Sequence, residues 1–281
     1  MIEEVVEKIL VVDDDRSTRH LIQLQLRSAG FSVETTEDGP STLERLERES
    51  FDLVLLDVWM PGMDGLEVMA RLREKPSAPK VVVMTADDAP ETVLRALRER
   101  ACRYVTKPIE PKELTALIRE VLDAGPERPI EVISAKPDWV ELVVPCDREA
   151  AARIQAVLGQ LEADLPEDVR TSVGQAFREL LNNAIEWGGA LDPNQTVRIS
   201  CLRAKRMLLY RISDPGGGFS FEGLSHAAVS NPPDNPMGHA MVREEMGLRP
   251  GGFGLVLTRA MVDELLYNEA HNEVVFVKYL D

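Results

Sequence analysis

Four short aliphatic runs in the first half of the chain each end in a polar side chain. They are ILVV at 9–12, DLVLL at 52–56, VVVM at 81–84 and YVT at 104–106. Amphipathic stretches with helical spacing separate the runs, and this alternation predicts parallel strands joined by crossover helices. Open α/β sheets bind their ligands at the carboxyl ends of the strands. We therefore expect the polar residues that follow the four runs to meet at one site.

Those polar residues are suited to phosphoryl chemistry. Asp13 and Asp14 follow the first run, Asp57 the second, Thr85 the third and Lys107 the fourth. Clustered carboxylates repel one another unless a divalent cation lies among them, and oxygen ligands suit Mg²⁺. A carboxylate with its metal can attack a phosphohistidine donor. We expect Lys107 and Thr85 to contact the remaining phosphoryl oxygens.

The segments ILVVDDDRSTR, LLDVWMPGMDGLE, VVVMTA and YVTKP resemble the successive motifs of response regulator receiver domains. The resemblance covers about residues 5–124 and implies a flavodoxin-like, doubly wound parallel sheet with Asp57 as the phosphoacceptor. It implies a magnesium site built from three carboxylates and one backbone carbonyl: Asp13, Asp14, Asp57 and Trp59. It also implies a cis Lys107-Pro108 bond, a Tyr104 ring that changes rotamer on phosphorylation, and a cognate histidine kinase as the phosphodonor.

The second half of the chain has a different order of elements. The segments are a strand WVELVV, helices from about 148 and over about 167–187, strands TVRISCLRA and MLLYRISD, a glycine- and proline-rich stretch, a helix near 254–266 and a strand EVVFVKYL. This order predicts helices layered on one face of a mixed sheet. The last helical stretch of the first half ends at Gly125-Pro126, and prolines recur in the following chain up to position 137. We expect domains at 1–124 and 138–281, joined by a linker at 125–137.

One helical segment of the second half carries polar residues on a single face. In FRELLNNAIEWGG, Glu179 and Asn183 are one helical turn apart, with Asn182 beside them. An amide oxygen is a suitable ligand for Mg²⁺ that nucleotide phosphates already hold. A carboxylate one turn away can orient or deprotonate an attacking hydroxyl. The segment thus predicts part of a nucleotide site.

Two glycine-rich segments offer further contacts for a nucleotide. ISDPGGGF follows a strand, so Asp214 can accept a hydrogen bond from an adenine amine while Gly216 and Gly218 let the backbone approach the base. RPGGFGLVL has three glycines just before a helix: Gly251, Gly252 and Gly254. Free N–H groups and the helix dipole favour phosphate oxygens at such a helix start.

In this order, and with a last strand ending in Val277-Lys278, these segments resemble the GHKL nucleotide-binding α/β sandwich of histidine kinases, Hsp90 and gyrase. They are most similar to anti-sigma-factor serine kinases over about residues 138–281. The resemblance implies ATP and Mg²⁺ as cofactors, Glu179 as candidate base, Asn183 as magnesium ligand, Asp214 as adenine contact and 219–250 as the ATP lid. The sequence departs from the family pattern at three positions: Trp187, Arg249 and Phe253.

Charge and cysteine content limit the partners and the compartment. The formal net charge is −16, and the acid excess extends over both halves, so direct nucleic-acid binding is not expected. Cys102, Cys146 and Cys201 are far apart and fit reduced thiols. The apolar runs are too short to span a bilayer, and the acidic start lacks the basic region of a signal peptide. We expect a cytoplasmic protein without a membrane partner.

Several functions share these nucleotide motifs. A histidine kinase is disfavoured, because the chain before the Asn183 helix lacks room for a dimerising helical hairpin. The histidines are expected to be ordinary surface or lid residues: His20, His226, His239 and His271. One interpretation is a phosphorylation-controlled protein serine/threonine kinase that acts on an anti-sigma-factor antagonist. The other is a non-catalytic, ATP-dependent binding switch that sequesters a sigma factor or its antagonist. The sequence does not separate them, and a homodimer stays open.

Overall fold

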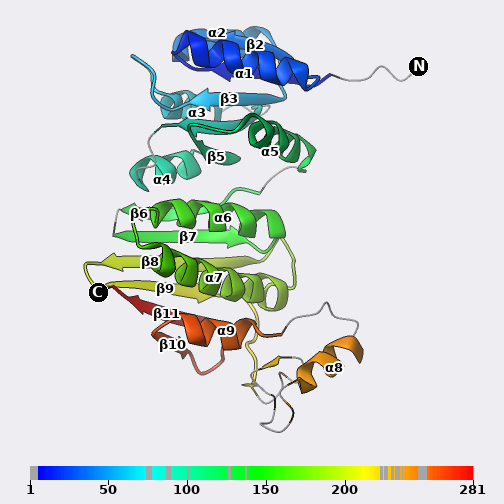
Figure 1. Cartoon of the computed structure of the whole chain (residues 1–281), viewed down its shortest axis with the longest axis vertical. Coiled ribbons are helices and arrows are strands. Elements are labelled where there is room, and N and C mark those ends of the chain that lie inside the picture. Colours follow the sequence, from blue (N-terminus) through cyan, green and yellow to red (C-terminus); the bar gives the residue numbers. More distant parts are fainter. Residues whose placement is uncertain are drawn as a thin grey trace. The chain divides into compact units, whose positions relative to one another are not determined.

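The computed structural model forms two compact units, Met1–Glu127 and Arg128–Asp281 (Figure 1). The described residues are 6–73, 78–86, 90–99, 101–125, 128–136, 138–221, 224, 227–228, 231, 235, 237–245 and 252–280. His226, Arg249 and Gly251 lie outside them. Within these stretches, no helix has the length and apolar character needed to cross a bilayer. The three cysteines are free thiols.

The first unit is a parallel five-stranded sheet in the order β2-β1-β3-β4-β5. Its strands are β1 (Lys8–Val12), β2 (Ser32–Thr36), β3 (Leu53–Asp57), β4 (Lys80–Thr85) and β5 (Arg103–Thr106). Its helices are α1 (Arg16–Ser28), α2 (Gly39–Arg48), α3 (Gly65–Arg73), α4 (Pro90–Arg98) and α5 (Pro111–Asp123). The doubly wound parallel sheet expected from the sequence is confirmed.

Both faces of this sheet are covered by helices. One buried cluster packs Ile22 and Leu26 of α1 and Ile118 of α5 against β1, β3 and β4. A second cluster packs Leu66 and Met69 of α3 against the opposite face of the same strands. Because side chains alternate between the faces, a strand buried on both sides needs an unbroken aliphatic run. This explains the pattern that predicted β1, β3 and β4.

A lysine at the start of β4 holds the carboxyl end of α5. Lys80 Nζ donates to the carbonyls of Val121 (2.6 Å) and Leu122 (3.3 Å), and also to that of Ala124. The last turn of α5 has no basic residue of its own. A cation there satisfies carbonyls that lack helical partners and interacts favourably with the helix dipole. Strand β4, which ends in Thr85, is thereby tied to the end of α5.

The second unit is a six-stranded sheet in the order β10-β11-β9-β8-β7-β6. Its strands are β6 (Glu131–Lys136), β7 (Trp139–Pro145), β8 (Thr196–Ala204), β9 (Met207–Ser213), β10 (Glu264–Tyr267) and β11 (Glu273–Tyr279). Its helices are α6 (Arg148–Leu161), α7 (Glu167–Asn183), α8 (Gly238–Glu245) and α9 (Gly254–Met261), and a π-helix, η1 (Ala184–Gly188), extends α7. Helices α6, α7 and α9 cover one face of the sheet (Figure 1).

The layering of helices on one face is confirmed, but the sheet is not mixed as expected. All its described strand pairs are antiparallel. The predicted helix near 254–266 ends at Met261, and the chain then enters β10. Asp263 accepts the backbone N–H of Tyr279 (2.6 Å), and Leu265 pairs with Phe276 of β11. These contacts with the neighbouring strand outweigh the helical spacing.

The segment expected as a linker, 125–137, is partly a strand. Glu131–Lys136 forms β6, which pairs with β7 at the edge of the second sheet with a register shift between Val132 and Ser134. Edge strands tolerate irregular and half-polar sequences because only one side carries ladder hydrogen bonds. The same reason explains β2, SVETT, an edge strand that the aliphatic runs did not indicate.

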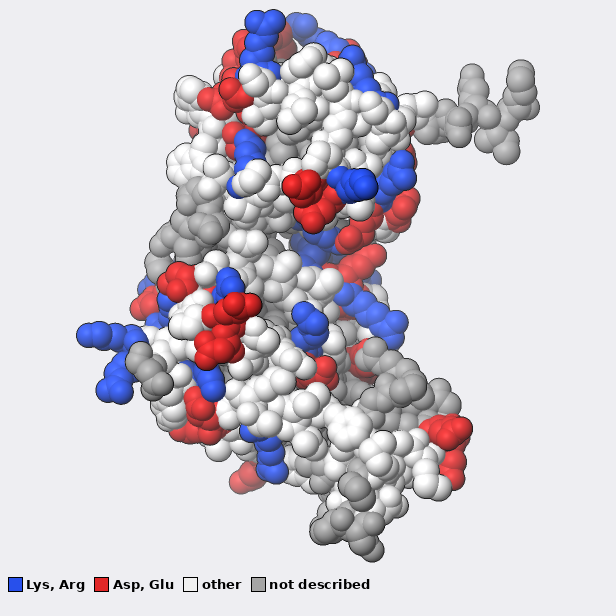
Figure 2. All heavy atoms as spheres, viewed as in Figure 1, with Lys and Arg blue, Asp and Glu red and all other residues white. Residues whose placement is uncertain are grey.

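Acidic and basic side chains are interspersed on the visible face of each unit (Figure 2). Ion pairs such as Arg48 with Glu44 and Arg71 with Glu67 link neighbours on exposed helix surfaces. That face of either unit shows no broad basic area among the described residues. The expectation that the protein does not bind nucleic acid directly stays a prediction.

Candidate functional site

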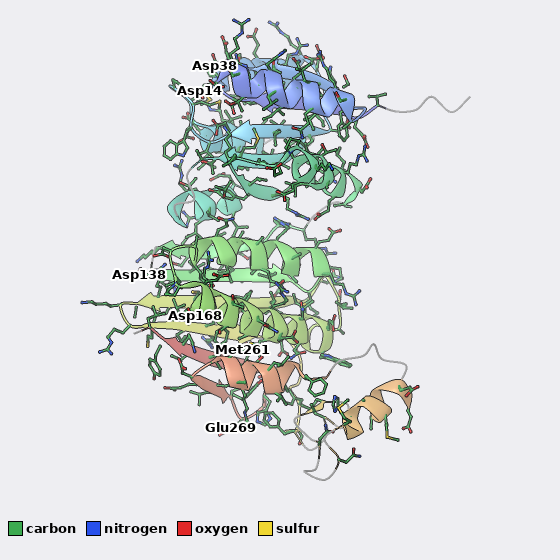
Figure 3. The ribbon with its side chains drawn as sticks, viewed as in Figure 1. Asp14, Asp38, Asp138, Asp168, Met261 and Glu269 are labelled. Carbon is green, nitrogen blue, oxygen red and sulfur yellow. The ribbon has the colours of Figure 1, made fainter. Side chains whose placement is uncertain are left out.

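The first candidate site lies at the carboxyl ends of β1 and β3, where Figure 3 labels Asp14. Carboxylate oxygens of Asp13, Asp14 and Asp57 lie within 4.8 Å of one another. Asp13 is 1% and Asp57 5% exposed. Lys107 Nζ, from the loop after β5, lies 2.6 Å from Asp13 Oδ2 and 3.0 Å from Asp57 Oδ2. The structure thus brings together residues that are as many as 94 positions apart.

Burial and charge shift the proton affinities of this group. Burial raises the pKa of Asp57, the Lys107 charge opposes that shift, and the Asp13 charge adds to it. The pKa of Lys107 is raised, because its hydrogen bond to Asp13 and its attraction to Asp57 outweigh the effect of burial. Lys107 is therefore held as a cation beside the predicted phosphoacceptor.

The loops that hold these side chains have local causes. A Cβ at Gly65 would collide with the Asp57 carbonyl, so only glycine lets α3 begin against the end of β3. The backbone N–H of Lys107 donates to the Thr85 carbonyl (2.7 Å), and the Lys107–Pro108 bond is cis, as the resemblance implied. The Thr85 side chain is fully buried at the end of β4. Thr85 and Lys107 are therefore neighbours at the same edge.

Arg19 is a contributor that the sequence analysis did not identify. Its guanidinium donates to the backbone carbonyls of Asp13 (2.6 Å) and Asp14 (2.9 Å) and forms an ion pair with Glu37. The Arg19 side chain thereby fixes the turn that carries both carboxylates. Arg19 is the last residue of the RSTR segment that follows the aspartates, but its contacts with the carbonyls could not be inferred without the geometry of the turn.

The three carboxylates suit a hard divalent cation. Two of them are nearly buried and one is exposed, so the cluster offers oxygen ligands and an open side. Asp13, Asp14 and Asp57 would hold Mg²⁺, which supplies charge neutralisation for a transferring phosphoryl group. The predicted ligand role of the Trp59 carbonyl stays a prediction. The Trp59 backbone N–H donates a hydrogen bond to Asp57, and the residue is 54% exposed.

The second candidate site is a cavity of about 620 Å³ in the second unit. All eight described residues that the sequence assigned to nucleotide contact line it: Glu179, Asn182, Asn183, Asp214, Gly216, Gly218, Gly252 and Gly254. They come from α7, from the segment after β9, and from the turn before α9 together with the first residue of that helix. Convergence of three separate segments on one cavity is the geometry that a nucleotide site requires.

Glycines leave the space that the Asp214 side chain occupies. A Cβ at Gly188 would collide with the Asp214 side chain, so this residue of the π-helix lets the carboxylate approach. The backbone N–H of Gly216 donates to Asp214 Oδ1 (2.9 Å), which leaves Oδ2 for a ligand. Burial raises the pKa of Asp214, and the Gly216 hydrogen bond opposes that shift. π-Helical segments are frequent at functional sites.

Glu179, the candidate base, lies against the start of α9. A Cβ at Gly254 would come within 2.5 Å of Glu179 Oε2, so the glycine leaves room for the carboxylate. The predicted base and the predicted phosphate-binding turn are thus in direct contact. Gly252 has φ +95°, a conformation that favours glycine.

The charges around the cavity are mostly negative. Four carboxylates line it: Glu179, Glu186, Asp214 and Glu273. Among the described residues, no lysine or arginine lines it. Bound phosphates would therefore depend on Mg²⁺ and on backbone N–H groups for charge compensation. Glu186 and Glu273 were not predicted from the sequence, because only the folded π-helix and the start of β11 bring them to the cavity.

Comparison with known proteins identifies the domain family of each unit. The response regulator receiver domain family matches residues 9–119, and the histidine kinase-like ATPase domain family matches residues 144–278. The chain is 35% identical over 204 residues to the DNA-binding response regulator MtrA of Mycolicibacterium paratuberculosis, covering 71% of this chain and 88% of that protein. The chain belongs to the response regulator family.

Other relatives match this response regulator over its receiver domain. The sensory transduction protein RegX3 of Mycolicibacterium smegmatis is 41% identical over 117 residues, which cover 42% of this chain and 51% of that protein. The solved structure of chemotaxis protein CheY4 of Vibrio cholerae is 29% identical, with a TM-score of 0.41, and the match covers 42% of this chain and 99% of that chain. The two family matches show that this response regulator combines a receiver domain with a histidine kinase-like ATPase domain.

Proposed function

We propose that this response regulator is a phosphorylation-controlled, ATP-binding protein serine/threonine kinase of the anti-sigma type, which acts on an anti-sigma-factor antagonist. A receiver domain implies a phosphodonor such as a histidine kinase, and ATPase domains of this family generally use ATP and Mg²⁺. The observation that carries the proposal is the cavity lined by Glu179, Asn183 and Asp214 together with the Gly252/Gly254 turn.

Each of these residues has a distinct role in the proposal. Asn183 holds the Mg²⁺ of the bound nucleotide, and Asp214 Oδ2 accepts a hydrogen bond from the adenine amine. Glu179 orients or deprotonates the serine hydroxyl of the partner. In the receiver domain, Asp57 accepts the phosphoryl group, while Asp13 and Asp14 hold Mg²⁺, and Lys107 and Thr85 contact phosphoryl oxygens.

The acidic lining supports a second candidate function. Phosphoryl transfer is usually assisted by a cationic side chain at the transferring group in addition to Mg²⁺, and the described lining residues include no lysine or arginine. A non-catalytic switch that binds ATP, and in that state sequesters a sigma factor or its antagonist, requires only the nucleotide contacts. The two functions differ in one observable, covalent phosphate on the partner.

The experiment incubates the full chain with Mg²⁺-ATP and candidate antagonist proteins and measures intact masses. The kinase proposal expects one added phosphoryl group on the partner. Glu179→Gln is expected to slow transfer about 100-fold or more while ATP affinity is kept, because a base acts on the transition state. Glu167→Gln, on the exposed first turn of the same helix, is the matched control.

The outcomes separate the two candidates. Unmodified partner mass, together with ATP-dependent complex formation, would reject the kinase and support the binding switch. A wild-type chain with no measurable affinity for Mg²⁺-ATP would reject both. Asp214→Asn is expected to weaken ATP binding by about 1–3 kcal/mol, because it impairs a partly buried polar contact.

A further inference from the structure

The β10–β11 turn, residues 268–272, forms one wall of the nucleotide cavity together with the glycine segment that follows β9. Besides a contact of the His271 side chain, three hydrogen bonds join them. The Asp214 N–H donates to the Asn272 carbonyl (2.9 Å), and the Asn272 side chain donates to the Gly216 carbonyl (2.9 Å). The Phe219 N–H donates to a carbonyl of the same turn (3.2 Å). The turn is therefore a fixed part of the site; Figure 3 labels Glu269 within it.

His271 in this turn lines the cavity, although the sequence suggested an ordinary surface or lid residue. Its backbone has φ +58°, which is uncommon for a residue with a side chain. Its Nδ1 lies 2.7 Å from the Phe219 carbonyl oxygen. A carbonyl only accepts hydrogen bonds, so Nδ1 carries the hydrogen, and Nε2 of the neutral ring is an acceptor.

Aromatic contacts fix the orientation of the imidazole. The His271 ring lies 5.2 Å from Phe219 at an interplanar angle of 30°, 4.9 Å from Phe221 and 5.7 Å from Tyr267, measured between ring centroids. Phe219 and Tyr267 also line the cavity. With Nδ1 held by the carbonyl and the ring held by its neighbours, Nε2 is the ring nitrogen that is left for a ligand.

The position of His271 limits which part of a nucleotide it can meet. It adjoins Asn272, whose carbonyl accepts the Asp214 backbone N–H, so it belongs to the end of the cavity that is proposed to bind adenine. An acceptor such as Nε2 needs a donor. In an adenine nucleotide the donors at this end are the base amine, which Asp214 is proposed to take, and the ribose hydroxyls.

We propose that His271 is a specificity-determining residue that accepts a hydrogen bond from a ribose hydroxyl and so selects ribonucleotides over deoxyribonucleotides. The proposal rests on the ATP binding proposed above. The proposal also accounts for the left-handed backbone of His271, because such a conformation in a well-packed segment is a common sign of a functional contact.

The test measures affinities of the full chain for Mg²⁺ complexes of ATP, 2′-deoxy-ATP and 3′-deoxy-ATP by calorimetry. The wild type is expected to bind one deoxy analogue about five- to tenfold more weakly than ATP, because the loss of one hydrogen bond typically lowers affinity by about this factor. His271→Asn tolerates the positive φ and keeps a donor for the Phe219 carbonyl, but removes Nε2. We expect H271N to bind ATP and that analogue with equal affinity.

His271→Gln is the rescue variant, because its amide oxygen reaches about as far as Nε2, and it is expected to restore part of the discrimination. If His271 had only a structural role, its substitution would lower the affinity for all three nucleotides equally and leave the ratios of the affinities unchanged. A wild type without discrimination, or an undiminished ratio in H271N, would overturn the role of His271 and leave the proposed function standing. Absence of binding to all three nucleotides in the wild type would instead overturn the ATP-binding proposal.

Discussion

Glu162, at the carboxyl end of α6, is a nearly buried carboxylic acid outside both sites. It is 4% exposed and accepts a hydrogen bond from the Tyr210 hydroxyl. Tyr210 itself packs between Phe177 and Phe276. Burial raises the pKa of Glu162 to about 7, and the Tyr210 hydrogen bond opposes the shift. The neutral acid is therefore the form that fits the folded domain.

This shift predicts that stability falls as the pH rises. The pKa is about 7 in the folded state and near 4.5 in the unfolded chain. The stabilisation is therefore complete below about pH 4.5 and is lost as the pH rises through 7, by about 3 kcal/mol in total. The glutamine of Glu162→Gln stays neutral at every pH. The difference in free energy of unfolding, variant minus wild type, is therefore expected to rise by about 2 kcal/mol between pH 5.5 and 8.

Urea unfolding of the wild type and the variant across this pH range checks the prediction. The contribution of the receiver domain cancels in the difference between the two proteins. Glu131→Gln, at an exposed position of β6, is the control and should show no pH-dependent difference. Parallel stability curves for wild type and E162Q would contradict the raised pKa.

At the scale of elements, the contact between α7 and α9 sets the position of the candidate base. Replacing Gly254 with alanine would place a methyl group against the Glu179 carboxylate, the mobile end of a long side chain. The side chain can move while the helices stay, so G254A should fold with unchanged or slightly higher stability. Phosphoryl transfer should fall about tenfold or more, because a displaced base no longer meets its proton.

Gly174→Ala provides the matched control, since that glycine lies within α7 and a Cβ there would meet nothing within 4 Å. It should be as stable as wild type or more so, with unaltered transfer. The measurements are melting temperature, Mg²⁺-ATP affinity and transfer rate for the three proteins. Wild-type transfer in G254A would show that the position of Glu179 is not critical.

The elements that the sequence predicted best are those with the strongest local pattern. Strands β1, β3 and β4 are buried on both faces, so their aliphatic runs were sufficient, and the ends of those runs located the Asp13, Asp57 and Thr85 cluster. Edge strands such as β6 and β10 carry weaker patterns, because one side of each is free of pairing. His271 could not be predicted, since its role depends on a turn held by contacts 52 residues away.

For the whole molecule, we predict that phosphorylation of Asp57 changes the affinity of the ATPase domain for its partner or the rate at which it phosphorylates that partner. Thr85, drawn toward the phosphoryl group, would leave space for Tyr104 to turn inward. Thr85 ends β4, and Lys80 at the other end of that strand holds α5, the last helix of the receiver domain. A coupling free energy of about 1–3 kcal/mol would suffice.

The measurement compares partner affinity and partner phosphorylation with and without beryllofluoride, which mimics the phosphoryl group on Asp57. Wild type should change about fivefold or more in at least one quantity. Asp57→Asn lacks the acceptor and should respond to neither beryllofluoride nor acetyl phosphate. Equal affinity and equal rate in both states of the wild type would contradict the coupling.

Because β6 belongs to the sheet of the second unit, only residues 124–130 separate α5 from the ATPase domain. Even fully extended, such a segment reaches only about 25 Å. A short tether of this kind gives each domain an effective concentration of about millimolar near the other. A mutual affinity with a dissociation constant well below about millimolar would therefore be saturated in the intact chain, even if separately purified halves at micromolar concentration stay apart. We therefore expect that dissecting this protein into its two halves would remove the regulation proposed for the intact chain.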